Sequence, residues 1–270
     1  MTTWPEKMGM LALRAVIVAV IIFLLAPLLV VVIVSFGHAA FIQFPPRALS
    51  LRWYFNLAQL EGFLDSLVLS LELAAITSSL TAFLGVSASL ALTRYRFRGR
   101  QALMSLFLSP LILPAIVIGI GMLQYFRAIG FLSTFATLVV AHVVITLPYM
   151  VRTVTSSLEL QNESLVEASR VLGADALQTF AFVIVPGIKS ALIAAVLFTF
   201  IMSFDNYSVS LFLSDAQYET LPIRILNYVE KTIDPTVAAA SSILIFISIG
   251  QLILGAWLVG VRRMGGLADK

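Results

Sequence analysis

The sequence predicts an all-α membrane protein with six transmembrane helices, a cytoplasmic helical hairpin between helices 4 and 5, and both termini in the cytoplasm. Three observations support this prediction. The 270 residues are 60% hydrophobic and only 11% charged, whereas soluble domains are about 25% charged. The apolar residues form runs long enough to cross a bilayer. The basic residues gather in alternate connections between these runs.

Six apolar runs reach the roughly 20 residues that a helix needs to cross the hydrocarbon. Lipid offers the backbone no hydrogen-bond partners, so each run is expected to be helical. The first run is too long for the apolar part of a signal peptide and has no clear cleavage site, so we expect a retained helix. Within a single membrane domain of residues 1–270, the runs are 12–35, 64–92, 103–125, 132–151, 188–213 and 237–261. Prolines inside the runs are tolerated as kinks; they are Pro27, Pro110, Pro114 and Pro148.

The basic residues predict the orientation, because cytoplasmic loops carry an excess of Lys and Arg. With the N-terminus inside, twelve of the 17 basic residues lie inside and five outside. The loop 93–102 is the strongest anchor. The inside set is Lys7, Arg14, Arg94, Arg96, Arg98, Arg100, Arg152, Arg170, Lys189, Arg262, Arg263 and Lys270. The outside set is Arg47, Arg52, Arg127, Arg224 and Lys231.

The composition excludes several kinds of site. No cysteine is present, which excludes disulfides, zinc–thiolate sites, iron–sulfur clusters and thiol nucleophiles. The basic residues are not interleaved with aromatics in a patch, so nucleic acid is not expected as a partner. The pattern G-x-x-x-x-G-K-[ST] is absent, so we expect no P-loop binding of ATP and no enzymatic activity in this chain.

Two outside segments, 36–63 and 214–236, are longer than simple turns. In the first, Pro45 and Pro46 force an extended entry, and SLRWYFNLAQL then predicts a short amphipathic helix capped by Ser50. The sequence leaves two roles open for both segments: anchoring at the lipid headgroups, or contact with a partner.

The longest inside loop, residues 152–187, predicts a helical hairpin beneath the membrane. Its first half, SSLELQNESLVEASRVL, has helical periodicity. Gly173 interrupts this pattern and suits a helix end with positive φ. ADALQTFAFVIV resumes a helical pattern with Asp175 as its cap, and Pro186 ends it before the fifth span. With one apolar and one charged face, such a hairpin is suited to binding a soluble partner.

This segment resembles the signature of the permease subunits of bacterial ABC importers. That signature is Glu-Ala-Ala, three residues, Gly, nine residues and Ile-x-Leu-Pro. The chain has Glu167, Ala168, Ser169, Gly173 and Pro186 at the same spacing. Three residues depart from the signature but keep a similar size: Ser169, Val183 and Val185.

In that family the hairpin docks into a cleft of the ATP-hydrolysing subunit and couples closure of the ATPase dimer to the transmembrane helices. By resemblance, Glu167 would pair with a basic residue of the ATPase, with Ala168 and Ser169 beside it. Gly173 would allow the turn between the two helices, and Pro186 would fix the re-entry into the membrane.

The resemblance also implies partners. These are a second homologous permease subunit, two ATPase subunits that use ATP and Mg, and a periplasmic substrate-binding protein. The chain itself would be a non-catalytic, multi-pass subunit of the bacterial inner membrane and would bind no cofactor and no metal.

From about residue 44 to 250 the chain looks like the smaller permease of spermidine/putrescine-type importers, most specifically in YRFRG and SFDNYSVSLFL. Such permeases usually carry a second acidic residue where Asn206 stands, so the exact cargo stays open. The resemblance favours a polyamine-like or other amine-bearing compound; the alternatives are an amino acid, an aminophosphonate or another small solute. An ATP-independent secondary transporter would require an intramembrane relay of acids and bases or an inverted repeat, and the sequence shows neither.

Two acidic residues within the predicted spans are candidates for the substrate path, because charges in hydrocarbon are costly and commonly functional. Asp205 lies in the outer half of the fifth span and Glu72 in the outer part of the second. We expect Ser203, Asn206 and Tyr207 to line the path with Asp205 and to attract an ammonium group. Alternatively, Asp205 bonds to polar groups of a neighbouring helix or of the partner permease. For Glu72, contact with a polar group on another helix is favoured over a place in the path.

Two further features of the spans are interpreted as structural. His142 is expected to be a neutral core histidine with one interhelical hydrogen bond rather than a proton carrier. The GIG at 119–121 follows no strand, so it is not a nucleotide-binding loop. Its small residues instead favour close packing of helices.

Overall fold

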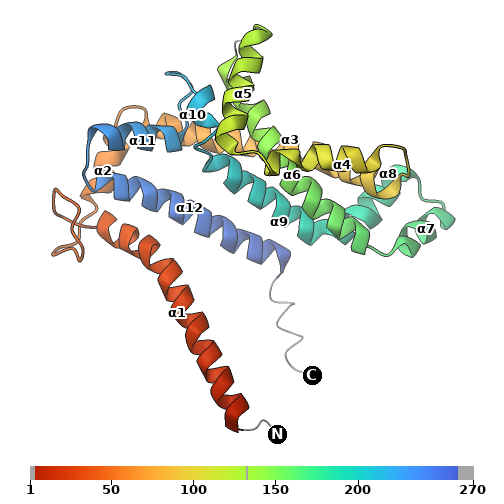
Figure 1. Ribbon diagram of the computed structural model, residues 1–270, viewed down its shortest axis with the longest axis horizontal. Coiled ribbons are helices and arrows are strands. Elements are labelled where there is room, and N and C mark those ends of the chain that lie inside the picture. The colour runs from red at the N-terminus through yellow and green to blue at the C-terminus, as the bar shows by residue number, and fades with distance from the viewer. Residues whose placement is uncertain (1–3, 132, 261–270) are drawn as a thin grey trace. The chain divides into compact units, whose positions relative to one another are not determined.

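The computed structural model describes residues 4–131 and 133–260, and these residues form helices without a strand. The chain divides into two compact units. Unit 1 comprises Met1–Phe63 and Ile225–Ile247, and unit 2 comprises Leu64–Arg224 and Ser248–Lys270. Figure 1 shows the helices of each. Three of the predicted orientation markers lie outside the described residues: Arg262, Arg263 and Lys270.

Unit 1 contains α1 (Trp4–Ser35), α2 (Arg52–Gln59), most of α11 (Leu221–Lys231) and the first half of α12 (Thr236–Val259). None of the most apolar window of α1 is buried, so its side chains are available to lipid or to another chain. The N-cap of α2 is Leu51 and not Ser50 as predicted, although the Ser50 hydroxyl accepts a hydrogen bond from the backbone N–H of Arg52 at 3.0 Å. Two hydrogen bonds hold α2 within the unit: Ser35 Oγ to Tyr54 OH at 2.7 Å, and Asn56 Nδ2 to Thr236 Oγ1 at 2.9 Å.

Unit 2 holds the remaining helices and the second half of α12. They are α3 (Phe63–Arg94), α4 (Arg100–Leu108), a 3-10 turn η1 (Ser109–Leu111), α5 (Ala115–Ala128), α6 (Thr134–Leu160), α7 (Glu163–Val171), α8 (Ala176–Thr179), a π-helical segment η2 (Phe180–Ile184), α9 (Val185–Phe204) and α10 (Ser210–Leu213). In Figure 1, α7 and α8 lie together at one end of this unit, and α5 lies beside α6 and α10.

Five helices of the described residues are long and apolar enough to cross a membrane: α1, α3, α6, α8–α9 together, and α12. A sixth span is counted if the bent pair Arg100–Leu111 and Ala115–Ala128 is one broken span, and its two parts meet at 104°. The sequence predicts one span over 103–125 with kinks at its prolines, whereas the structure breaks the helix there into two parts. The break has a local cause, because Pro114 disfavours helical geometry at the residue before it and forms the N-cap of α5.

The core of unit 2 lies where α6 packs against α3 and α9. The α6 residues Met150, Val154 and Leu158 are at most 2% exposed. On the α3 side small and hydroxyl residues permit close approach, which is typical of helices packed in lipid. A Cβ on Gly85 would meet Met150, and Thr81 Oγ1 lies 3.0 Å from Thr146 Oγ1.

Two spans differ in length from their predictions. Helix α6 continues to Leu160, well beyond the predicted end at 151. Residues in this extension, Val154, Thr155 and Leu158, are still buried against other helices. The fifth span was expected to run to residue 213, but α9 ends at Phe204. The chain from Asp205 to Val209 leaves the helix before the short α10 begins at Ser210. This second difference creates the polar break described below.

Candidate coupling and translocation sites

The hairpin between α6 and α9 is ordered by local hydrogen bonds at each helix end. Asn162 caps α7, since its Oδ1 accepts from the backbone N–H of Ser164 at 3.1 Å. Gly173 then turns the chain with φ +87°, the positive φ predicted from the sequence. Asp175 and Gln178 form a capping box at the start of α8, with bonds of 2.7 and 3.0 Å. A capping residue of this type stabilises a helix by about 1 kcal/mol.

Ser169, one of the three residues that depart from the signature, joins the two arms of the hairpin. Its hydroxyl lies 3.0 Å from Thr179 Oγ1 and donates to the Val166 carbonyl at 2.8 Å. An alanine, as in the signature, could make neither bond. Periodicity alone could not find this pairing, because it joins residues on either side of a turn.

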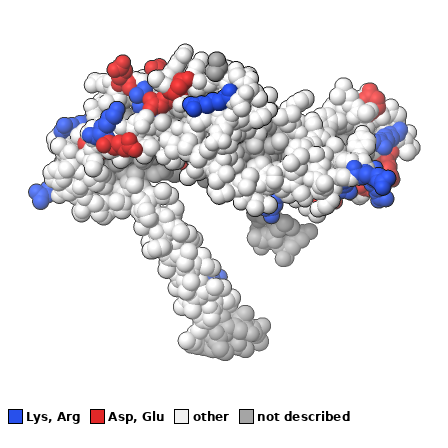
Figure 2. Space-filling view, turned by 45° about the horizontal axis from the view of Figure 1, so that its top comes forward, with Lys and Arg blue, Asp and Glu red and all other residues white. Residues whose placement is uncertain are grey.

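Glu167 and Ala168 are exposed on α7, and Glu167 makes no hydrogen bond or ion pair with any described residue. Large apolar side chains near them are also exposed: Leu165 (55%), Val171 (87%), Leu172 (87%), Leu177 (74%) and Phe182 (77%). Figure 2 shows charged side chains of both signs gathered at the end of unit 2 that carries α7 and α8. An unpaired carboxylate beside exposed apolar side chains suits a protein partner with a basic group and an apolar cleft.

Pro186 does not separate the hairpin from the fifth span. The helix continues from Ala176 through the π-helical segment η2 into α9, and Pro186 lies in the first turn of α9. Pro186 has no N–H to donate to the preceding turn, and the π-helical segment directly before it is the local adjustment that lets the helix pass through the proline. The prediction that Pro186 ends the pattern is therefore wrong, and the second arm of the hairpin is continuous with the membrane helix.

The second candidate site is the break after α9. Asp205 is the C-cap of α9 and its side chain is exposed, as is Tyr207 at 37%. Asn206 is turned inward to a local bond, since its Oδ1 accepts from the backbone N–H of Val209 at 3.0 Å. The C-terminal end of a helix carries partial negative charge, so Asp205 adds a full negative charge to a place that already attracts cations.

Ser203 is predicted to line the substrate path with Asp205, but its side chain points into the protein. It is buried, and its hydroxyl bonds to Nδ1 of His142 at 2.8 Å. The other ring nitrogen, Nε2, lies 3.0 Å from Ser210 Oγ. His142, completely buried on α6, therefore holds the chain on both sides of the break. The sequence predicted one interhelical hydrogen bond; the seven-residue spacing of Ser203 and Ser210 is the signal that could have indicated two.

Helix α5 packs against the far side of the break. A Cβ on Gly119 would lie 2.9 Å from Phe212 Cδ2 and 3.2 Å from Val209 Cα, so a larger residue would require these neighbours to shift. The close packing predicted for this glycine is confirmed. Gly121 has nothing within 4 Å and takes no part in it.

Glu72 is exposed on α3 and bonds to none of the described residues, so its expected contact with a polar group on another helix is not found within the chain. Neither a hydrogen bond nor an ion pair joins it to Asp205. Across the part of the chain that the structure describes, no three His, Asp or Glu side chains are grouped so that they could hold a metal ion.

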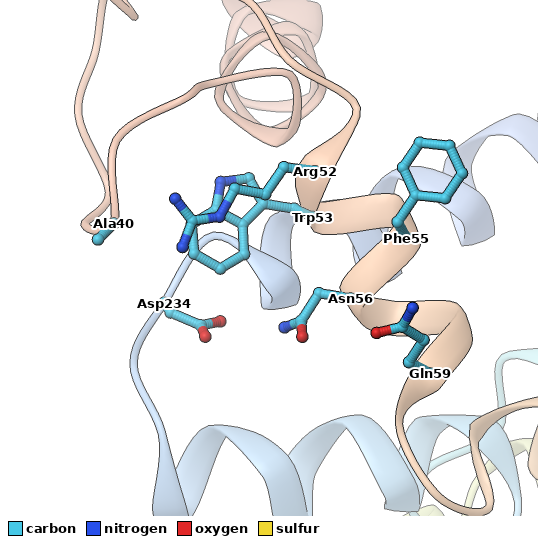
Figure 3. A pocket seen from close by; sticks show the side chains of 7 residues that line it. All are labelled: Ala40, Arg52, Trp53, Phe55, Asn56, Gln59 and Asp234. Carbon is cyan, nitrogen blue, oxygen red and sulfur yellow. The ribbon is translucent and has the colours of Figure 1, made fainter.

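Unit 1 has a polar hollow of about 590 Å³ beside α2 (Figure 3). The guanidinium of Arg52 stacks over the ring of Trp53, 4.6 Å from its centroid. Asp234 faces the same hollow, but its carboxylate already accepts bonds from Tyr228 OH at 3.0 Å and the Thr236 N–H at 2.9 Å. The hollow therefore presents one cation without an ion-pair partner among the residues described.

Residues 81–260 match the family described as the binding-protein-dependent transport system inner membrane component. Among curated proteins, the spermidine/putrescine transport system permease protein PotC of Haemophilus influenzae is 30% identical over 232 residues, which cover 86% of this chain and 90% of that protein. The putrescine transport system permease protein PotI of Escherichia coli is 30% identical over 247 residues, covering 89% of this chain and 87% of that protein.

Solved structures share the fold. A chain of a bacterial ABC transporter involved in the import of the acidic polysaccharide alginate has a TM-score of 0.70 at 14% identity, with 99% of each chain covered. A chain of the inward-facing MetNI methionine ABC transporter has a TM-score of 0.60 at 20% identity, covering 73% of this chain and 94% of that one. The family match begins within α3 and extends to the end of α12, so it includes the hairpin and the break. The chain therefore belongs to the family of binding-protein-dependent transport system inner membrane components.

Proposed function

We propose that this permease imports a polyamine-like or other amine-bearing compound, which a periplasmic binding protein delivers. Relatives that are 30% identical over most of this chain are named for spermidine and putrescine transport. The residue chemistry agrees, because Asp205 places a carboxylate at the negative end of α9, where an ammonium group would be attracted. Tyr207 adds an exposed ring to this break, and aromatic rings bind organic cations favourably.

The energy source in this proposal is a pair of separate ATPase subunits, which use ATP and Mg. The observation that carries it is the hairpin: Glu167 is unpaired and exposed on the first arm, beside exposed apolar side chains, and the second arm is continuous with α9. Movement of an ATPase bound to the hairpin would pass through the second arm into the helix that ends at Asp205. A second, homologous permease would complete the path, and six spans with both termini in the cytoplasm would put the hairpin on the ATPase side.

Glu167→Lys tests the energy source. It reverses the charge at the proposed contact, and we expect loss of ATP-driven uptake and of the binding of purified ATPase to the permease. Glu159→Lys, at an exposed position near the end of α6, is the matched control and is expected to retain both. Normal ATPase binding and uptake by the Glu167 variant would contradict the proposal.

The cargo is tested separately, on the binding protein that acts with this permease. Calorimetric titration with putrescine, spermidine, an amino acid and an aminophosphonate identifies the compound delivered. We expect the polyamines to bind at least tenfold more tightly than the others. Preference for an amino acid or an aminophosphonate would retain the importer and replace its cargo.

A secondary transporter is the remaining alternative from a different class. It would take up putrescine in response to an ion gradient without ATP. Uptake by proteoliposomes that contain the permeases without the ATPases would support that alternative.

A further inference from the structure

The side chain of Gln161 joins three segments where the hairpin meets the membrane helices. It follows the last residue of α6, so it lies at the start of the hairpin. Its Oε1 accepts a hydrogen bond from Nη2 of Arg94, at the end of α3, at 3.1 Å. Its Nε2 donates to the carbonyl of Val183, in η2, at 3.0 Å. One amide thus connects α3, the first arm of the hairpin and the second arm.

The acceptor lies in an unusual part of the helix. Residues Phe180–Ile184 form a π-helical segment between α8 and α9. Such segments have a wider hydrogen-bond pattern than an α-helix and occur frequently at functional sites. A hydrogen bond to Val183 therefore holds the helix where its own geometry changes.

Gly187 makes room for this contact on α9. A Cβ at this position would overlap the Gln161 amide and lie 3.0 Å from its Cδ. Glycine inside a helix costs about 1 kcal/mol relative to alanine. The presence of glycine at 187 is therefore explained by the approach of Gln161 and not by helix stability.

The other polar contact at this junction is weaker. Arg94 Nη1 lies 3.4 Å from Glu163 Oε1, and the Glu163 side chain is 78% exposed. An ion pair with one partner in solvent contributes little. The Arg94 side chain is only 18% exposed, and its Nε is buried without a partner, so its orientation depends mainly on Gln161.

Apolar contacts at the same place cannot replace the amide. Leu158, Val166, Ile184 and Ile188 form a buried cluster that holds the arms of the hairpin together. Apolar burial is largely non-directional, so the cluster fixes the register of the two arms less sharply than a hydrogen bond does. A hydrogen bond between two fixed groups resists sliding, because it weakens steeply with distance and angle.

We propose that Gln161 is a positioning residue that makes the hairpin and the start of α9 move as one body, so that force applied to the hairpin reaches the substrate path. This inference rests on the proposed function, because it assumes that the hairpin receives force from an ATPase. The hydrogen bond to Val183 is the essential contact, and the contact with Arg94 orients the amide. Without the bond to Val183, the hairpin would move on ATP binding while α9 followed incompletely.

Two substitutions break this bond from opposite sides. Gln161→Glu keeps the length of the side chain and its acceptor for Arg94, but a carboxylate cannot donate to the Val183 carbonyl. Gly187→Ala leaves Gln161 intact and displaces its amide. We expect either variant to import about fivefold less putrescine per ATP hydrolysed, the factor expected when one hydrogen bond is lost. The double variant should be no worse than either single variant, because all three lose the same contact.

The assay uses the complete transporter in proteoliposomes with radiolabelled putrescine. Gly121→Ala is the control, because a Cβ there meets nothing within 4 Å. The chain contains no cysteine, so cysteines introduced at Ser164 and Lys189 are its only sites for spin labels. In the parent protein, the distance between these labels should have one narrow distribution with and without ATP. In the Gln161 and Gly187 variants, the distribution should broaden when ATP binds.

The outcomes separate this inference from the proposed function. A distance distribution in both variants as narrow as in the parent protein would overturn the inference, whatever the cargo. Gln161→Glu that transports normally would also overturn it, because that variant retains the Arg94 contact alone. If the parent protein imports no putrescine, the proposed cargo fails, while the spin-label distances still decide the role of Gln161.

Discussion

Replacing His142 with alanine tests whether the break after α9 is held from outside the helix. The ring bonds Ser203 before the break and Ser210 after it, at 2.8 and 3.0 Å. Alanine removes both bonds and a completely buried ring. Neither serine has another side-chain partner on α6 among the described residues.

The magnitude follows from these contacts. Hydrogen bonds between membrane helices contribute about 0.6 kcal/mol each on average, so the two bonds contribute about 1 kcal/mol. Removal of the large buried ring also leaves a cavity, which costs about 1–3 kcal/mol. We therefore expect His142→Ala to lower the free energy of unfolding by about 2–4 kcal/mol. The loss of the two bonds, taken by itself, should lower the population of the ordered form of the break about fivefold.

The assay measures unfolding in detergent and uptake in proteoliposomes. The variant should unfold at a lower temperature, and its uptake should require a higher concentration of loaded binding protein because the break is less ordered. His38→Ala is the matched control, since His38 is the other histidine of the chain and its side chain is exposed. If His142→Ala unfolds and transports like the His38 variant, the reasoning about the break is refuted.

The remaining predictions concern packing, charge and pH. Gly85→Ala should destabilise the permease by about 1–3 kcal/mol, because a Cβ there meets Met150 Cβ at 2.9 Å; an unchanged unfolding temperature would contradict this packing. Asp205→Asn should weaken putrescine uptake and the stimulation of ATP hydrolysis by loaded binding protein, and the charge hypothesis fails if both are unchanged. The hydrogen bond from Thr134 lowers the pKa of Asp215 below its ordinary 3.8. The resulting stabilisation is complete above pH 3.8 and disappears as the pH falls through the lowered pKa, so Asp215→Asn should show less loss of thermal stability in acid than the parent protein; an equal loss would contradict this assignment.

The amino-acid sequence alone predicts the membrane class, most of the spans and the hairpin. Long apolar runs and the distribution of Lys and Arg act through transfer to lipid, which depends on each segment alone. The turn at Gly173 and the cap at Asp175 are also local, since each involves only a few neighbouring residues. These features could be predicted because their causes lie within one segment.

Contacts between segments decided the rest. The fifth span ends at Phe204, where His142 bonds both sides of the break, and hydrophobicity does not reveal that bond. The helix passes through Pro186, because the π-helical segment before it accommodates the missing N–H, and that change of helix geometry is not visible in the sequence. Nothing in the sequence distinguishes Gln161, whose contacts with Arg94 and Val183 form only in the folded chain. Hydrogen bonds between distant segments depend on positions in space, so only the folded chain reveals them.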